Sequence, residues 1–353
     1  MPSTILRRAA PLLAAGLVAC AEVADPLPPP EALLLVPDSA TAELAVRPIL
    51  APEDVAVLPL GPGATPTGVA TRGGLAALPL GSGDQVVVID LALGTVLREV
   101  DFPVGAYPSA AAFASDTVLF VALAGIDRVG RVSLVTGDTS SMAVGVDPRG
   151  LAFTRGRLFV LNANTEPCAG TADRCARGPS WITAIDPAEF AGAGTPDSIG
   201  LPGAVNATTA TVGIDGQLYV VAAGDPASPE GRLHVVDPVE GTELANFGGL
   251  GSRPGSAAAL DDRILIASRS EGLLEFDTRA REFLRGAGEG VPLAGAVGVA
   301  VDEDGRVWVP READCPGTPG VLSVLRRDLT LLRELPSGPC PSGVALALVP
   351  REP

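Results

Sequence analysis

The sequence predicts an all-β protein, a seven-bladed β-propeller whose last blade is closed by N-terminal strands. Three observations support this fold: a short phrase recurs seven times, its copies lie 40 to 58 residues apart, and the last copy is followed by the end of the chain. Propeller blades repeat at about 40–45 residues and contain four short strands each. We therefore assign residues 31–353 to the propeller.

The recurring phrase is a proline followed by small residues, as in PSAAA at position 108. Its seven copies begin at positions 66, 108, 148, 206, 254, 296 and 341. Innermost strands converge on the axis of a propeller, so small side chains are expected there. In the fourth copy, NATTA, Asn206 occupies the place of the proline.

Three further strands follow each of the first six phrases. A tight turn leads to an alternating strand such as LFVLNAN from Leu158, and a third strand ends in an apolar residue and an aspartate, as in Ile89-Asp90. A more polar fourth strand completes the unit, as in TVLREV from Thr95. We expect the aspartate to cap the turn that follows it, through its side chain.

The seventh unit is incomplete, because the chain stops after PSGVALALVP. Three strands that begin near Ala32, Glu43 and Asp54 precede the first phrase and supply what is missing. We expect them to pair with residues 344–349 and close the ring. Closure of this kind removes the free strand edges that would otherwise promote aggregation.

The sequence of one unit resembles the YVTN family of propeller repeats. This unit reads VVVIDLALGTVLREVDFPVGAYPSAAAF and is followed by LFVAL. It is also similar to NHL-type and SMP-30-type propellers, and the resemblance covers residues 31–353. The full Tyr-Val-x-Asn signature is missing, and the nearest match runs from Phe159 to Asn162. The resemblance implies the fold and hardly any function, because propellers host many unrelated activities.

The N-terminus resembles a bacterial lipoprotein signal. Arg7 and Arg8 precede an apolar run, 9–19, that is too short to span a bilayer, and the run ends in Leu-Val-Ala before Cys20. We interpret 1–19 as a signal peptide, Cys20 as the lipidated residue and 20–30 as a proline-rich linker. The expected location is the cell envelope, outside the cytoplasm and attached to a membrane by lipid. Ala21 is not aspartate, which favours the outer membrane.

Four cysteines remain, and an even number in an exported chain suggests two disulfides. Three pairings are possible. Cys168 and Cys175 share one loop of the third blade, while Cys315 and Cys340 lie in neighbouring loops on the same face of the sixth and seventh blades. This topology favours Cys168–Cys175 and Cys315–Cys340 over the other pairings, and over a zinc site whose ligand spacing would differ.

Long insertions fall on the same face, so we predict that it carries the binding site. Polar side chains at the ends of the second strands are expected to ring the mouth of the central channel. These candidates are Asp127, Arg128, Asn162, Asn164, Asp225, Arg269, Glu271, Arg311 and Glu312. The resemblance to SMP-30-type propellers implies a divalent cation such as calcium held by Glu, Asn and Asp, although no clear matching set stands out.

Two function classes fit these features. The favoured one is a non-catalytic binding or scaffold protein for an unknown protein or small molecule, and the alternative is a metal-dependent lactonase or hydrolase of the SMP-30 type. The formal net charge of −16 argues against nucleic acid as a partner. His234 is the single histidine, so any catalytic triad would have to use it, and its strand context predicts a packed or surface residue instead of a base.

We predict that Cys20→Ala abolishes labelling of the chain by a clickable fatty acid and releases the protein from membranes, because the substitution removes the thiol that carries the lipid. Labelling and membrane fractionation of cells that express each form measure the effect. Unchanged membrane association of the variant would refute the assignment.

Overall fold

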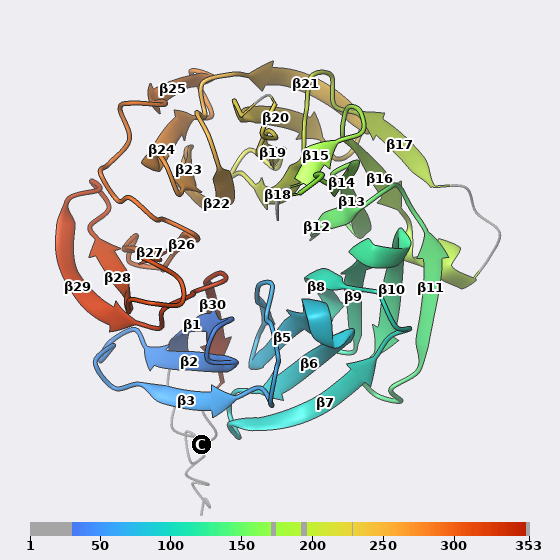
Figure 1. Ribbon diagram of the computed structural model, residues 1–353, viewed down its shortest axis with the longest axis horizontal. Helices are drawn as coiled ribbons and strands as arrows, with labels where there is room; N and C mark the ends of the chain where they lie inside the picture. The colour runs from blue at the N-terminus through green and yellow to red at the C-terminus, as the bar shows by residue number, and fades with distance from the viewer. Residues whose placement is uncertain (1–29, 171–173, 192–195, 228, 351–353) are drawn as a thin grey trace, which may run out of the picture.

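The computed structural model describes residues 30–170, 174–191, 196–227 and 229–350. Seven four-stranded antiparallel sheets stand around a central axis, which confirms the predicted seven-bladed propeller (Figure 1). The predicted signal peptide and Cys20 lie outside the described residues. No described helix is both long enough and apolar enough to cross a membrane.

The blades are numbered from the first complete unit and given from the innermost strand outwards. Blade one contains β4 (Ala70–Arg72), β5 (Leu75–Leu80), β6 (Gln85–Asp90) and β7 (Thr95–Asp101). Blade two contains β8 (Pro108–Ser115), β9 (Val118–Leu123), β10 (Arg128–Ser133) and β11 (Thr139–Ala143). Blade three contains β12 (Pro148–Thr154), β13 (Arg157–Asn162), β16 (Trp181–Ile185) and β17 (Asp197–Gly200). Blade four contains β18 (Ala207–Val212), β19 (Leu218–Ala222), β20 (Arg232–Asp237) and β21 (Thr242–Phe247).

The last three blades follow the same plan. Blade five contains β22 (Pro254–Leu260), β23 (Arg263–Ser268), β24 (Gly272–Asp277) and β25 (Glu282–Arg285). Blade six contains β26 (Ala300–Val301), β27 (Val307–Arg311), β28 (Gly320–Leu325) and β29 (Leu331–Ser337). Blade seven contains β30 (Ala345–Val349), β1 (Glu31–Asp38), β2 (Glu43–Pro48) and β3 (Ala56–Pro59). Outside the blades lie a hairpin, β14 (Thr165–Pro167) with β15 (Arg174–Ala176), and the 3₁₀ turns η1 (Gly81–Gly83), η2 (Ala124–Ile126) and η3 (Pro187–Ala191).

The two ends of the chain share blade seven, as the incomplete last unit predicts. Strand β1 pairs with β30 in an antiparallel register that sets Glu31 opposite Val349 and Leu35 opposite Ala345. The Asp38 carboxylate accepts a hydrogen bond from the Cys340 backbone N–H at 2.7 Å. Closure therefore uses strand pairing as well as a side-chain contact at one end of the strand.

The repeat phrase marks the start of the innermost strands, as predicted, but its predicted register in blade four needs a correction. Pro108, Pro148 and Pro254 pair with Leu123, Asn162 and Ser268, and the equivalent pairing in blade four is Ala207 with Ala222. Ala207, and not Asn206, therefore holds the place of the proline, so the predicted register of the fourth copy is wrong by one residue. Asn206 instead adopts the left-handed backbone (φ 59°) that precedes the strand, as Asp147 does in blade three (φ 53°).

Aspartates at the ends of the third strands cap the following turns, as expected. Asp90 Oδ1 accepts hydrogen bonds from the N–H groups of Ala92 and Leu93 at 3.0 and 3.1 Å. Asp237 and Asp277 make the same pair of contacts in blades four and five. The repeated aspartate is therefore a turn residue.

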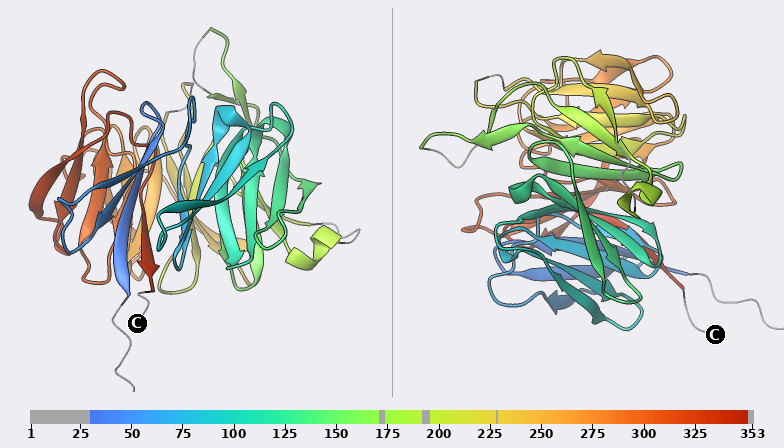
Figure 2. Two further views of the ribbon diagram at one scale, coloured as in Figure 1. Left: turned by 90° about the horizontal axis from the view of Figure 1, so that it is seen from below. Right: turned by 90° about the vertical axis from the view of Figure 1, so that its right-hand side faces the viewer.

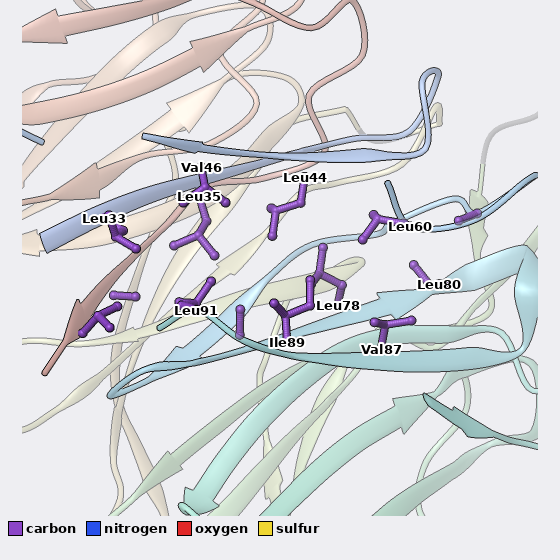
Figure 3. Packing of buried hydrophobic residues seen from close by; sticks show 14 residues of the cluster. Leu33, Leu35, Leu44, Val46, Leu60, Leu78, Leu80, Val87, Ile89 and Leu91 are labelled. Carbon is purple, nitrogen blue, oxygen red and sulfur yellow. The ribbon is translucent and has the colours of Figure 1, made fainter. Parts of the chain in front are cut away.

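The hydrophobic core lies between neighbouring blades. Leu35 of blade seven belongs to one buried cluster with Leu78 and Ile89 of blade one (Figure 3).

Hydroxyl groups in or next to the innermost strands add a second connection between blades. Thr67 Oγ1 donates to the Pro108 carbonyl at 3.2 Å, and Ser109 Oγ donates to the Pro148 carbonyl at 2.7 Å. The small hydroxyl residues of the phrase thus join successive blades as well as fit the narrow axis.

Both predicted disulfides are present. Cys168–Cys175 and Cys315–Cys340 have Cα–Cα distances of 5.1 and 5.2 Å, within the range of about 4.4–6.8 Å that a bridge requires. The first bridge lies at the β14–β15 hairpin, and the second connects the loop after β27 to the segment that leads into β30. The two bridges indicate an oxidising, extracytoplasmic location for the chain.

We predict that Cys315→Ser with Cys340→Ser lowers the free energy of unfolding more than Cys168→Ser with Cys175→Ser does. The bridges span 25 and 7 residues, for which the chain-entropy model gives about 3.5 and about 2.4 kcal/mol. Chemical denaturation of the full chain and the two double variants measures both losses. Equal losses, or a larger loss for the short bridge, would contradict the prediction.

Candidate ligand-binding site

The two faces of the ring differ in the segments that they carry. The β14–β15 hairpin rises from one face, while the described ends of the chain, at β1 and β30, leave from the opposite face (Figure 2). Asp38 and Cys340 mark the hairpin face in blade seven, where the chain crosses into β30. We call the hairpin face the mouth face.

A cavity of about 990 Å³ opens around the axis. In each of the seven blades, the residue that directly follows the proline position of the repeat lines this cavity. Every blade therefore contributes to the wall of the cavity. These equivalent residues are Thr67, Ser109, Arg149, Thr208, Gly255, Val297 and Ser342. Six of the seven are small or medium uncharged residues, and the seventh is an arginine.

Four arginines line this cavity: Arg149, Arg174, Arg253 and Arg269. Asp225 is the one acidic residue among the described lining residues. The lining therefore carries a formal charge of +3, from four arginines and one aspartate, in a chain whose formal net charge is −16. The cavity wall thus has the opposite sign to the protein as a whole.

A buried carboxylate holds two of these arginines. Asp147 Oδ1 accepts from Arg149 Nε at 2.7 Å, and Asp147 Oδ2 contacts an Arg174 terminal nitrogen at 2.8 Å. The Asp147 side chain is only 3 % exposed, and it also accepts a hydrogen bond from the Thr165 hydroxyl. The Arg149 guanidinium lies 5.4 Å from the centre of the Tyr107 ring, which supports it on another side. Asp147 therefore fixes both guanidinium groups next to each other.

The disulfide hairpin positions Arg174. Strand β15, which begins with Arg174, pairs with β14, and Cys168–Cys175 closes this short segment. At its other end the Ala176 N–H donates to Asp225 Oδ2 at 3.0 Å. The hairpin is thereby tied both to Asp147 of blade three and to the loop after β19 of blade four.

The other two arginines come from blade five. Arg253 is exposed, has a left-handed backbone (φ 57°), and its side chain makes no ion pair or hydrogen bond with any described residue. Arg269 Nε contacts Glu312 Oε1 of blade six at 2.5 Å. Both arginines also line a neighbouring pocket of about 460 Å³ together with Arg311 and Glu312.

The structure brings only part of the predicted candidate set together. Asp225 and Arg269 line the main cavity, and Arg269, Arg311 and Glu312 line the neighbouring pocket. Arg311 is also bound to the Glu334 carboxylate at 2.8 Å and to the Ala294 carbonyl at 3.1 Å. Four members of the set therefore line the two hollows.

The remaining candidates make contacts within the fold. Asn162 is predicted on the rim, but its side chain is fully buried in blade three, where it accepts from the Gly145 N–H and donates to Thr183 Oγ1. Each of the other four has a partner in a turn or adjacent strand. Asp127 accepts from the Asp147 N–H, Arg128 donates to Ser141, Asn164 donates to the Pro179 carbonyl and Glu271 accepts from the Gly288 N–H.

Sequence reasoning missed Arg149, Arg174 and Arg253. Arg149 and Arg253 belong to the repeat phrase or directly precede it, whereas the predicted rim residues come from the ends of the second strands. A usable signal exists for one of them: Arg149 breaks the run of small residues at its position in the phrase. Arg174 has no such signal, because its place depends on the fold of the hairpin.

The expected calcium ligands do not converge. Among the described residues there is no group of three or more His, Cys, Asp or Glu side chains that could hold a metal ion. Glu312 is paired with Arg269, Glu271 with a backbone N–H, and the Asn162 side chain is buried within its blade. These residues therefore do not fit the metal site that the resemblance implies.

The single histidine is packed inside its blade, one of the two predicted placements, and it is not among the residues that line the cavity. His234 in β20 is fully buried, and its Nδ1 lies 2.6 Å from Glu243 Oε1. Its Nε2 is also buried and has no hydrogen-bond partner among the described residues. Burial lowers the pKa of His234 below the ordinary value of 6.5, against the opposing effect of Glu243.

The fold and the cavity define the class of this protein: a seven-bladed β-propeller with an arginine-lined cavity on its axis. No family model and no curated protein matches the sequence. Solved structures match it in fold. Hydrazine synthase of Kuenenia stuttgartiensis is 18% identical (TM-score 0.60, 79% of this chain and 88% of that chain), and a functionally unknown protein from Desulfotomaculum acetoxidans is 13% identical (TM-score 0.65, 90% and 99%).

A third structure similar to this chain is virginiamycin B lyase from Staphylococcus aureus, at 14% identity and a TM-score of 0.57 over 80% of this chain and 91% of that chain. The names of the three proteins describe a synthase, a protein of unknown function and a lyase, so the names point to no common activity. At such identities the likeness establishes the propeller fold alone.

We predict that the His234 ring titrates with a midpoint below 6.5, measured by NMR on a preparation without a histidine tag. The chain has one histidine, so its ring signals need no further assignment. In the unfolded chain the His234 ring takes up a proton below about pH 6.5, whereas in the folded chain the same ring stays neutral there. The free energy of unfolding should therefore fall with decreasing pH in that window, by up to about 1.4 kcal/mol per pH unit.

The His234→Gln variant provides the control, because it keeps a polar side chain and loses the titration. Its unfolding free energy should lack the part of the pH dependence that belongs to His234. A midpoint at or above 6.5 in the folded protein would contradict the assignment of burial as the dominant effect.

Proposed function

We propose that this protein is a non-catalytic binding propeller, held at the cell envelope by a lipid on Cys20, which binds a small molecule in the cavity on the mouth face. The cavity of about 990 Å³ carries this proposal. It falls within the range of about 300–1,000 Å³ that is usual for ligand sites. All seven blades contribute to its wall, so the site is a property of the closed ring.

The position of the chain ends supports the anchored arrangement. Strand β1 begins at Glu31 on the face opposite the mouth (Figure 2). The segment from Cys20 to Glu31 contains four prolines between positions 26 and 30, and proline-rich linkers are extended and semi-rigid. A lipid on Cys20 would therefore hold the opposite face towards the membrane and leave the mouth face accessible to ligand.

The wall of the cavity also supports binding over chemistry. Hydroxyl groups such as those of Thr67 and Ser109 are already engaged with carbonyls of the next blade. Arg149 and Arg174 are held by Asp147 in fixed positions. Fixed polar groups around a cavity orient a ligand at a low cost in side-chain entropy.

We predict that Thr208→Trp blocks ligand binding, because an indole at this position would occupy the cavity that Thr208 lines. A thermal-shift panel of sugars, organic acids, amino acids, lactones, calcium and zinc tests the full chain. At least one compound should raise the melting temperature of the unchanged protein and fail to do so for the variant.

Val212→Trp is the matched control, since Val212 lies on the same strand, β18, and is exposed. It should respond to ligand as the unchanged protein does. A compound that stabilises all three forms equally would show that binding occurs elsewhere, and a panel without any stabilising compound would count against the proposal.

A further inference from the structure

The charge of the cavity wall identifies the class of ligand that it suits. Four arginines and one aspartate line it, although acidic residues outnumber basic ones, 41 to 25, in the whole chain. Two acidic neighbours outside the lining, Asp147 and Glu312, offset part of this charge. Four arginines against these two carboxylates and Asp225 leave a formal excess of +1, so the mouth stays positive.

Asp147 holds two cations with one negative charge. Arg149 uses Nε for Asp147, and no described residue accepts a hydrogen bond from its two terminal nitrogens. The Arg149 side chain is 22 % exposed, so the guanidinium is largely enclosed and still borders the cavity. Terminal nitrogens of a guanidinium form a planar fork that matches the oxygens of a carboxylate or phosphate.

Arg253 adds a cation with no partner among the described residues. It reaches the same cavity from blade five, two blades away from Arg149. None of the described residues that line the cavity is aromatic. The wall thus combines the unpartnered guanidinium of Arg253 and the terminal nitrogens of Arg149 with small and hydroxyl side chains, a surface for a polar anion.

We infer that the mouth cavity binds a small molecule through a carboxylate or phosphate group, with Arg149, Arg174 and Arg253 as its cationic contacts. This inference rests on the proposed binding function and adds the chemical class of the ligand. Arg149 and Arg174 provide the fixed part of the anion site, and Arg253 provides an exposed cation from blade five.

Isothermal titration calorimetry of the full chain with citrate, inorganic pyrophosphate and spermidine tests the inference. Citrate or pyrophosphate should bind, and spermidine should not bind in the cavity. Stronger binding of citrate would identify a carboxylate ligand, and stronger binding of pyrophosphate would identify a phosphate ligand.

Arg253→Glu should weaken binding of the anion tenfold or more, and it does not endanger the fold because the side chain is exposed and has no partner among the described residues. Arg279→Glu is the matched control: it makes the same change in net charge in the same blade, at a side chain that is 80 % exposed in the β24–β25 turn. Arg149→Lys keeps the charge but removes the planar fork, so it should weaken binding as well.

Equal affinities of the Arg253→Glu and Arg279→Glu variants, or no binding of either anion, would overturn the inference. The proposed function has a separate test in Thr208→Trp. If a neutral or cationic compound binds and only Thr208→Trp blocks it, the cavity is a binding site for another class of ligand. If no compound depends on Thr208, the binding function itself fails.

Discussion

Antiparallel pairing of β1 with β30 joins the two ends of the described chain, and the rest of the molecule depends on it. The Asp38–Cys340 hydrogen bond within this closure connects residues 302 positions apart. Without the pairing, blade seven would present an open edge, and the buried cluster shared with blade one would lose a wall. The Cys315–Cys340 bridge fastens the same closure covalently to blade six.

Ring closure also creates the cavity, because it brings the start of seven innermost strands to one axis. At that radius most positions accept only small side chains, and the hydroxyl groups among them bind the next blade. Arg149 departs from this pattern and is tolerated because a buried carboxylate, Asp147, compensates its charge. A charge placed in such surroundings requires a partner to offset its desolvation.

The disulfide hairpin converts a loop of blade three into part of the mouth. Cys168–Cys175 closes it, and contacts with Asp147 and Asp225 tie it to blades three and four. It lies on the face opposite the described chain ends (Figure 2). The hairpin and the closure of blade seven therefore meet on the same face: the hairpin shapes the mouth on the side of blades three and four, and Ser342 of blade seven also lines the cavity.

The sequence by itself determined the seven blades, the closure by N-terminal strands and both disulfide pairs, because the repeat phrase and its spacing are local features. It did not determine which polar side chains meet at the mouth. Asn162 lies buried inside its blade, while Arg149, Arg174 and Arg253 converge from a strand, a hairpin and a turn. Only the tertiary structure decides this, because the ring brings together side chains that no spacing along the chain relates.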